Sequence, residues 1–127
     1  MDSTGRRWEA LQSMTKIKNE ASILLGTFLD ELGLKHTKEF KFCPDRRWAA
    51  DFYVPTLKLL IELEGGTGYF LNPKGGVVLG GRHNKAAGYA EDCLKYNEAQ
   101  RLGFRVLRFT TGQVLNGDAK ELIAKWL

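Results

Sequence analysis

The sequence predicts an α/β domain in which a mixed four-stranded sheet is flanked by helices. Three observations predict it: apolar residues at helical spacing early in the chain, three strand-like segments in the middle, and a helix followed by one further strand near the end. Strands joined by short turns pair antiparallel, whereas a strand reached through a helix pairs parallel with the strand before it. We therefore expect an antiparallel meander whose third strand pairs in parallel with a fourth.

The first half of the chain is predicted to form one helix and three strands. The helix covers residues 16–32, where apolar residues recur at three- and four-residue spacing, and Gly33 ends it. Turns are expected at Pro44 and Pro55, between segments that alternate or run apolar. The expected strands cover residues 37–42, 48–53 and 57–64. The third has a continuously apolar middle, which is typical of a strand covered on both faces.

The second half is predicted to contain a loop, a crossover helix, a strand and two closing helices. Residues 65–85 are rich in glycine and show little periodicity, so we expect a loop there. A helix from about residue 86 or 88 to residue 102 ends at Gly103, and a strand covers 104–109. Either Thr110 or Thr111 can cap a short helix that runs through Leu115, and an amphipathic helix follows.

Length and composition indicate one domain over residues 1–127, with residues 1–15 as a flexible N-terminal extension. The net charge of +4 favours a polyanionic partner. No apolar run is long enough to cross a membrane, and the polar residues 1–9 are unlike a secretory signal. Cys43 and Cys93 match no zinc pattern and are expected to be reduced thiols. These features favour a cytoplasmic protein.

Three acidic side chains are predicted to share one face of the sheet. Glu62 and Glu64 project together because alternate residues of a strand point to the same face. An antiparallel hairpin brings Asp51 opposite this pair. Carboxylates so placed repel one another, and a divalent cation can offset the repulsion. Mg²⁺ accepts one or two carboxylates with water and phosphate oxygens, so we expect a metal site. The alternative is a solvated acidic strand face.

Four segments of the chain resemble PD-(D/E)XK nucleases. They are, in order, WAADFYVP, KLLIELEGG, GRH and GYAEDCLKYNEAQRLGFRVLRFT. The sequence is most similar to phage and bacterial members related to very-short-patch-repair endonucleases and to archaeal-type Holliday junction resolvases, over residues 20–114. The resemblance implies the restriction-endonuclease-like αβββαβ core. It also implies hydrolysis of DNA phosphodiester bonds with Mg²⁺, for which Mn²⁺ can substitute.

The resemblance also implies roles for individual residues. Asp51 matches the aspartate of the second strand, and Glu62 matches the (D/E) position of the third. Glu64 stands where many members carry lysine, and Lys95 on the following helix is a candidate replacement; the alternative is a surface lysine. Glu20 matches a first-helix glutamate that joins the site in resolvase-like members. The sequence lacks the cysteines and histidines that would hold a structural zinc in very-short-patch-repair enzymes, which argues against that subgroup.

The glycine-rich segment carries candidates for DNA contact. Lys74, Arg82 and Lys85 offer positive charge to phosphates. His83 lies where similar nucleases carry a histidine near the attacking water or the scissile phosphate, acting as a base or hydrogen-bond donor. The alternatives are a mobile surface loop and an incidental histidine.

These observations predict a Mg²⁺-dependent DNA endonuclease of phage or bacterial origin. No helix-turn-helix or zinc module that would read bases is visible, so we expect recognition of branched or distorted DNA. A homodimer offers two sites to a four-way junction, and a Holliday junction resolvase acting in recombination or repair is the leading expectation. The alternatives are a nicking endonuclease of the mismatch-repair or restriction type, and an inactive nucleic-acid-binding module of the same fold.

Overall fold

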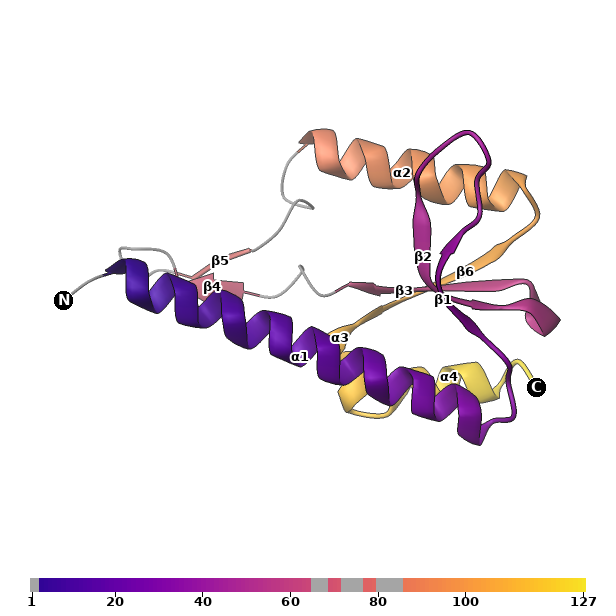
Figure 1. Cartoon of the computed structure of the whole chain (residues 1–127), viewed down its shortest axis with the longest axis horizontal. Helices are drawn as coiled ribbons and strands as arrows, with labels where there is room; N and C mark the ends of the chain where they lie inside the picture. The colour runs from indigo at the N-terminus through magenta and orange to yellow at the C-terminus, as the bar shows by residue number, and fades with distance from the viewer. Residues whose placement is uncertain (1–2, 65–68, 72–76, 80–85) are drawn as a thin grey trace.

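The computed structural model describes residues 3–64, 69–71, 77–79 and 86–127, with side chains described over 16–64 and 88–127. A four-stranded sheet lies between two helical layers (Figure 1). One layer is α1 (Ser3–Glu31) with α3 (Thr111–Leu115) and α4 (Asp118–Ala124). The other layer is α2 (Ala86–Arg101). The predicted α/β class is confirmed.

The sheet has the mixed topology that the sequence predicts. Its strands are β1 (Thr37–Lys41), β2 (Ala49–Val54), β3 (Leu59–Glu64) and β6 (Arg105–Thr110), in the spatial order β1-β2-β3-β6. The first three strands pair antiparallel, and β3 pairs parallel with β6 after the crossover through α2. This topology makes β3 a central strand, with its carboxyl end next to that of β6.

Each face of the sheet has its own hydrophobic core. Leu59, Ile61 and Leu63 of β3 pack with α1, α3 and α4. Leu60 points to the opposite face and packs with Ala99 of α2. The predicted alternation along β3 is therefore confirmed. It leaves Glu62 and Glu64 on the α2 face, where they follow Leu60 in sequence.

Two boundaries differ by more than one residue from those predicted. The first helix begins at Ser3, so its backbone is helical through the segment predicted as an extension. Glu, Leu, Gln, Met and Ala are good helix formers there and can continue a helix without an apolar stripe. The third strand begins at Leu59, because Pro55–Leu57 form a 3₁₀ turn that ends at Lys58. Lys58 takes a φ of 48°, in the left-handed region, and so turns the chain into β3.

The segment predicted as a loop contains a short hairpin. The strands β4 (Tyr69–Leu71) and β5 (Val77–Leu79) pair antiparallel as a separate two-stranded sheet. Aromatic and β-branched residues in these strands favour extended structure, which the surrounding glycines obscured in the sequence pattern. No helix in the part of the chain that the structure describes is long and apolar enough to cross a membrane.

Candidate active site

Asp51 is fixed between β2 and β3 by a backbone hydrogen bond. Backbone pairing of the two strands runs from Val54 opposite Leu59 to Phe52 opposite Ile61. Beyond that pair, the backbone N–H of Leu63 donates to Asp51 Oδ2 at 2.7 Å. The carboxylate thus replaces the backbone acceptor that a continued ladder would supply, and it is held against the strand that carries the two glutamates.

Glu62 is a nearly buried carboxylate with a lysine as its ion-pair partner. It is 8% exposed, and its Oε1 lies 2.9 Å from Lys95 Nζ. Burial raises the pKa of Glu62 from its usual 4.5 to about 7, against the opposing effect of Lys95. The charges of Asp51 and Glu64 raise the pKa further. The three acids therefore lie close enough to interact electrostatically, as the sequence predicts.

Lys95 joins α2 to the acidic strands. Its Nζ donates to the backbone oxygen of Ala49 at 2.9 Å, in addition to its ion pair with Glu62. Its side chain is only 15% exposed, so the alternative of an ordinary surface lysine is wrong. The structure therefore places Lys95 beside Glu62.

Glu64 has partners of a different kind. Its Oε1 accepts from Arg108 Nε at 2.7 Å and from the Tyr96 hydroxyl at 3.2 Å. The Arg108 guanidinium lies over the Tyr96 ring, 4.3 Å from its centroid. The repulsion among the acids is thus offset by two cations of the chain itself, Lys95 and Arg108. The sequence suggested a divalent cation for this purpose, and the structure adds two side chains that serve it.

The arrangement fits a metal held by two carboxylates better than one held by three. Among the side chains that the structure describes, no three from His, Cys, Asp and Glu are arranged to hold a metal ion. Glu64 Oε1 is engaged by Arg108 and Tyr96. Asp51 and Glu62 suffice for Mg²⁺, which takes one or two carboxylates together with water and substrate oxygens. Their chemistry as hard, anionic oxygen donors fits that ion.

Three residues of the cluster were missed in the sequence. Asp92 is 9% exposed, and its charge contributes to raising the pKa of Tyr96. Burial, and then the charges of Glu62 and Glu64, raise the pKa of Tyr96 above its usual range. The helical spacing of 92, 95 and 96 places Asp92 and Tyr96 on the same face of α2 as Lys95, a signal available in the sequence. Arg108 gave no such signal, because its place depends on the pairing of β3 with β6.

Of the remaining predicted residues, only Glu20 is described by the structure, and it shows no contact with the acids. Glu20 is exposed on α1, the helix that covers the other face of the sheet. Between described side chains, no hydrogen bond or ion pair joins Glu20 to Asp51, Glu62 or Glu64. Lys74, Arg82, His83 and Lys85 lie outside the described residues, so their predicted roles remain predictions.

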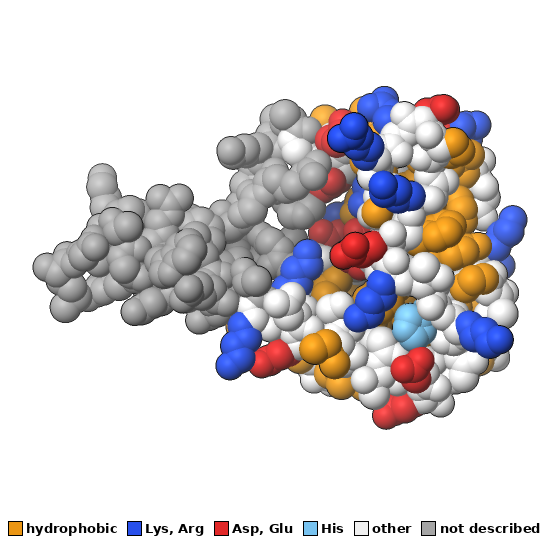
Figure 2. Space-filling view, in the orientation of Figure 1, with side chains coloured by type: hydrophobic (Ala, Val, Ile, Leu, Met, Phe, Trp, Pro, Cys, Tyr) orange, Lys and Arg blue, Asp and Glu red, His pale blue; other side chains and the backbone are white. Residues whose placement is uncertain are grey.

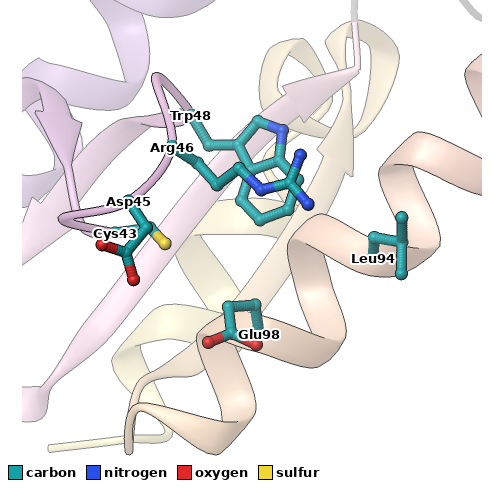
Figure 3. Close-up of a pocket in the computed structure, with 6 residues that line it drawn as sticks. All are labelled: Cys43, Asp45, Arg46, Trp48, Leu94 and Glu98. Atoms are coloured by element: carbon teal, nitrogen blue, oxygen red, sulfur yellow. The ribbon is translucent and has the colours of Figure 1, made fainter.

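The surface around the acids carries both signs of charge. Figure 2 shows a group of acidic side chains on this face with lysine and arginine side chains close by. A pocket of about 220 Å³ lies elsewhere, between the segment before β2 and the helix α2 (Figure 3). It is lined by Cys43, Asp45, Arg46, Trp48, Leu94 and Glu98. None of these residues belongs to the acid cluster.

Comparison with known proteins supports the fold. No family model matches the sequence, and no curated protein matches it. One similar solved structure is the catalytic domain of the homing endonuclease I-Bth0305I. The two chains superpose with a TM-score of 0.59 at 21% sequence identity, over 84% of this chain and 91% of that one. At this identity the likeness establishes a shared fold.

Proposed function

We propose that this chain is a DNA endonuclease that hydrolyses phosphodiester bonds with Mg²⁺, or with Mn²⁺ in its place. The observation that carries the proposal is the set of Asp51, Glu62 and Lys95 at the end of β3, joined by contacts of 2.7 to 2.9 Å to that strand or its neighbour. The fold shared with a homing endonuclease catalytic domain supports it, although fold alone does not assign chemistry.

Asp51 and Glu62 are the residues that would hold the metal. The Leu63 N–H orients Asp51, and burial makes an unpaired charge on Glu62 costly, so that a cation beside it is favoured. A divalent ion bound there supplies an activated water and stabilises the charge that builds on the phosphate. Binding of that ion is coupled to release of the proton that Glu62 carries below about pH 7.

Lys95 takes the place of the lysine that Glu64 replaces in the PD-(D/E)XK pattern. The backbone oxygen of Ala49 holds its Nζ at 2.9 Å, so that the ammonium group stays beside Glu62 with little freedom. A fixed positive charge near an attacking water favours its deprotonated form and stabilises the developing negative charge. The presence of this lysine favours an enzyme over an inactive module of the same fold.

Branched DNA, and in particular a Holliday junction, is the substrate that we propose for this site. The support is the resemblance to resolvases and the absence of a visible base-reading module. A nicking endonuclease acting on linear duplex is the second candidate. The similar structure is the catalytic domain of a homing endonuclease, and this likeness supports the second candidate.

The proposal is tested by cleavage of a panel of junction, flap, mismatched and duplex DNA in Mg²⁺, Mn²⁺ or EDTA. We expect cleavage with either metal and none in EDTA. Asp51→Asn and Glu62→Gln should each lower the rate about 100-fold or more, the scale of losing one electrostatic contact to a reacting centre. Glu121→Gln, at an exposed acid of α4, is the matched control and should cut normally.

Metal binding should be measured separately from cleavage. Mn²⁺ binding followed by electron paramagnetic resonance should weaken in Asp51→Asn and Glu62→Gln and stay unchanged in Glu121→Gln. Robust cleavage in EDTA would contradict the metal mechanism. Binding of DNA and Mn²⁺ with no cleavage of any substrate would favour the inactive module.

A further inference from the structure

Arg108 lies at the acid cluster and has no place in the chemistry proposed above. It stands directly beside Glu62 in the parallel register of β3 and β6. Paired residues of neighbouring strands point to the same face, so Arg108 shares the face of Glu62 and Glu64. The ion pair of its Nε with Glu64 Oε1, at 2.7 Å, confirms this orientation.

Arg108 is the more accessible of the two cations at the cluster. Its side chain is 45% exposed, whereas that of Lys95 is 15% exposed. The ammonium group of Lys95 is already engaged by Glu62 and by the backbone oxygen of Ala49. Arg108 engages Glu64 through Nε, and among the described residues no hydrogen bond is seen from its two terminal nitrogens. A guanidinium has five donors in a fixed fork, so donors remain for a second acceptor.

The Tyr96 ring lies against the Arg108 guanidinium. The ring centroid lies 4.3 Å from the guanidinium carbon, and the Tyr96 hydroxyl donates to the same Glu64 oxygen. A guanidinium held between a ring and a carboxylate loses less freedom when it binds a further group, because its position is already restricted.

We propose that Arg108 is a phosphate-binding residue of this active site, which binds a phosphate of DNA through its terminal nitrogens while its Nε stays on Glu64. The inference rests on the proposed function, because it takes the bound polyanion to be DNA. A phosphate that approaches Asp51, Glu62 and Glu64 meets repulsion, and an accessible cation on the same face offsets it. Arginine binds phosphate through two parallel N–H donors, which a half-exposed guanidinium can present.

The test is DNA binding in Ca²⁺ by Arg108→Gln, with Arg105→Gln as the matched control. Arg105 lies on the same strand and also faces an aromatic ring, with its guanidinium carbon 5.1 Å from the centroid of Trp126. It points to the opposite face, where Trp126 packs against the other core. We expect Arg108→Gln to bind DNA about 10-fold or more weakly, and Arg105→Gln to bind like the wild type. The slope of log affinity against log salt should fall by about 0.9 in Arg108→Gln alone.

A scan with single methylphosphonates separates a direct contact from a structural effect. Neutralising one phosphate should weaken binding by the wild type and leave binding by Arg108→Gln unchanged at that position. If Arg108 had a purely structural role, Arg108→Gln would instead bind every substituted DNA more weakly than the wild type by the same factor. Arg108→Lys keeps the positive charge but loses the paired N–H donors of the guanidinium. Compared with Arg108→Gln, it should restore the wild-type salt slope but only part of the wild-type affinity.

The outcomes distinguish this inference from the proposed function. An unchanged salt slope in a folded Arg108→Gln protein, with no position-specific coupling in the scan, would overturn the role of Arg108 while leaving the endonuclease proposal intact. A wild-type protein that binds no DNA at all would overturn both.

Discussion

Glu62 illustrates how burial and charge act on a single residue of this site. Its carboxylate is removed from water beside two further acids, and one lysine offsets part of the cost. A divalent cation would complete the compensation. In the absence of metal, a charged Glu62 therefore lowers the stability of the fold.

The pH dependence of stability should reveal this effect. The pKa of Glu62 is about 7 in the folded protein and 4.5 in its ordinary state. Between these values the folded state holds a proton that the unfolded state releases, so the stability contributed by Glu62 is lost as pH rises from about 4.5 to 7. The Gln side chain of Glu62→Gln stays neutral at every pH. In EDTA, the free energy of unfolding of this variant should therefore rise relative to that of the wild type by up to about 3 kcal/mol across this window.

Chemical unfolding of both proteins between pH 4.5 and 8 measures the effect, with Glu121→Gln as the control at an exposed acid. A constant difference between Glu62→Gln and wild type at all pH values would show that Glu62 titrates normally in the folded state.

Asp51 should have a structural role that can be separated from its chemical one. Asp51→Ala removes the acceptor of the Leu63 N–H and should cost about 1–3 kcal/mol, the penalty for leaving a part-buried donor unpaired. Asp51→Asn keeps an acceptor oxygen and should unfold close to the wild type. Both variants should lose cleavage, because both lose the charge. Equal stability of Asp51→Ala and Asp51→Asn would mean that the hydrogen bond contributes nothing measurable.

At the scale of elements, the site is assembled where α2 crosses the carboxyl ends of β3 and β6. One face of α2 presents Asp92, Lys95 and Tyr96 to the acids, while β6 supplies Arg108. The strand β6 then passes directly into α3, and Thr110 stands at that junction beside Glu64 in the β3–β6 register. The stability of this junction therefore matters for the geometry of the site.

The cap at Thr110 gives a prediction for this junction. The Thr110 hydroxyl accepts from the Gln113 backbone N–H at 3.1 Å, and the Gln113 side chain accepts from the Thr110 N–H at 3.0 Å. Thr110→Ala breaks this capping box and should lower the free energy of unfolding by about 1 kcal/mol. Thr111→Ala, one residue later and inside the helix, should change it much less. Urea denaturation compares the two, and equal losses would rule out the cap as the cause.

At the scale of the whole molecule, two cores on the two faces of one sheet hold the acid cluster at the carboxyl end of β3. Among the residues that the structure describes, one copy therefore offers one candidate site, whereas resolving a four-way junction requires paired cuts in two strands. A two-fold dimer supplies two sites of opposite polarity.

We accordingly predict a homodimer that binds four-way junctions in preference to linear duplex. Light scattering gives the mass in solution, and competition between junction and duplex of equal length gives the preference. Arg105→Gln is the control. Its side chain lies on the face away from the acids, so it should show the same preference for junctions as the wild type. A monomer that nicks duplex as fast as junction would move the assignment to the nicking endonuclease.

The sequence by itself determined the order of the elements, the mixed sheet and the shared face of Glu62 and Glu64. These features are local, because helical and strand periodicities act over a few residues and the crossover rule follows from element order. The hairpin of β4 and β5 was not predicted, because its strands are short and the surrounding glycines show no strand pattern. The full length of α1 was not predicted either, because its first half has no apolar periodicity.

The tertiary structure alone decided what surrounds each acid. Arg108 lies 44 positions from Glu64 in the chain, and the Leu63 N–H lies 12 positions from Asp51. Whether such groups meet depends on strand register and on the packing of α2 across the sheet, which no local pattern encodes. The sequence could therefore predict that the acids repel one another, whereas only the packed fold could show that Lys95 and Arg108 offset that repulsion.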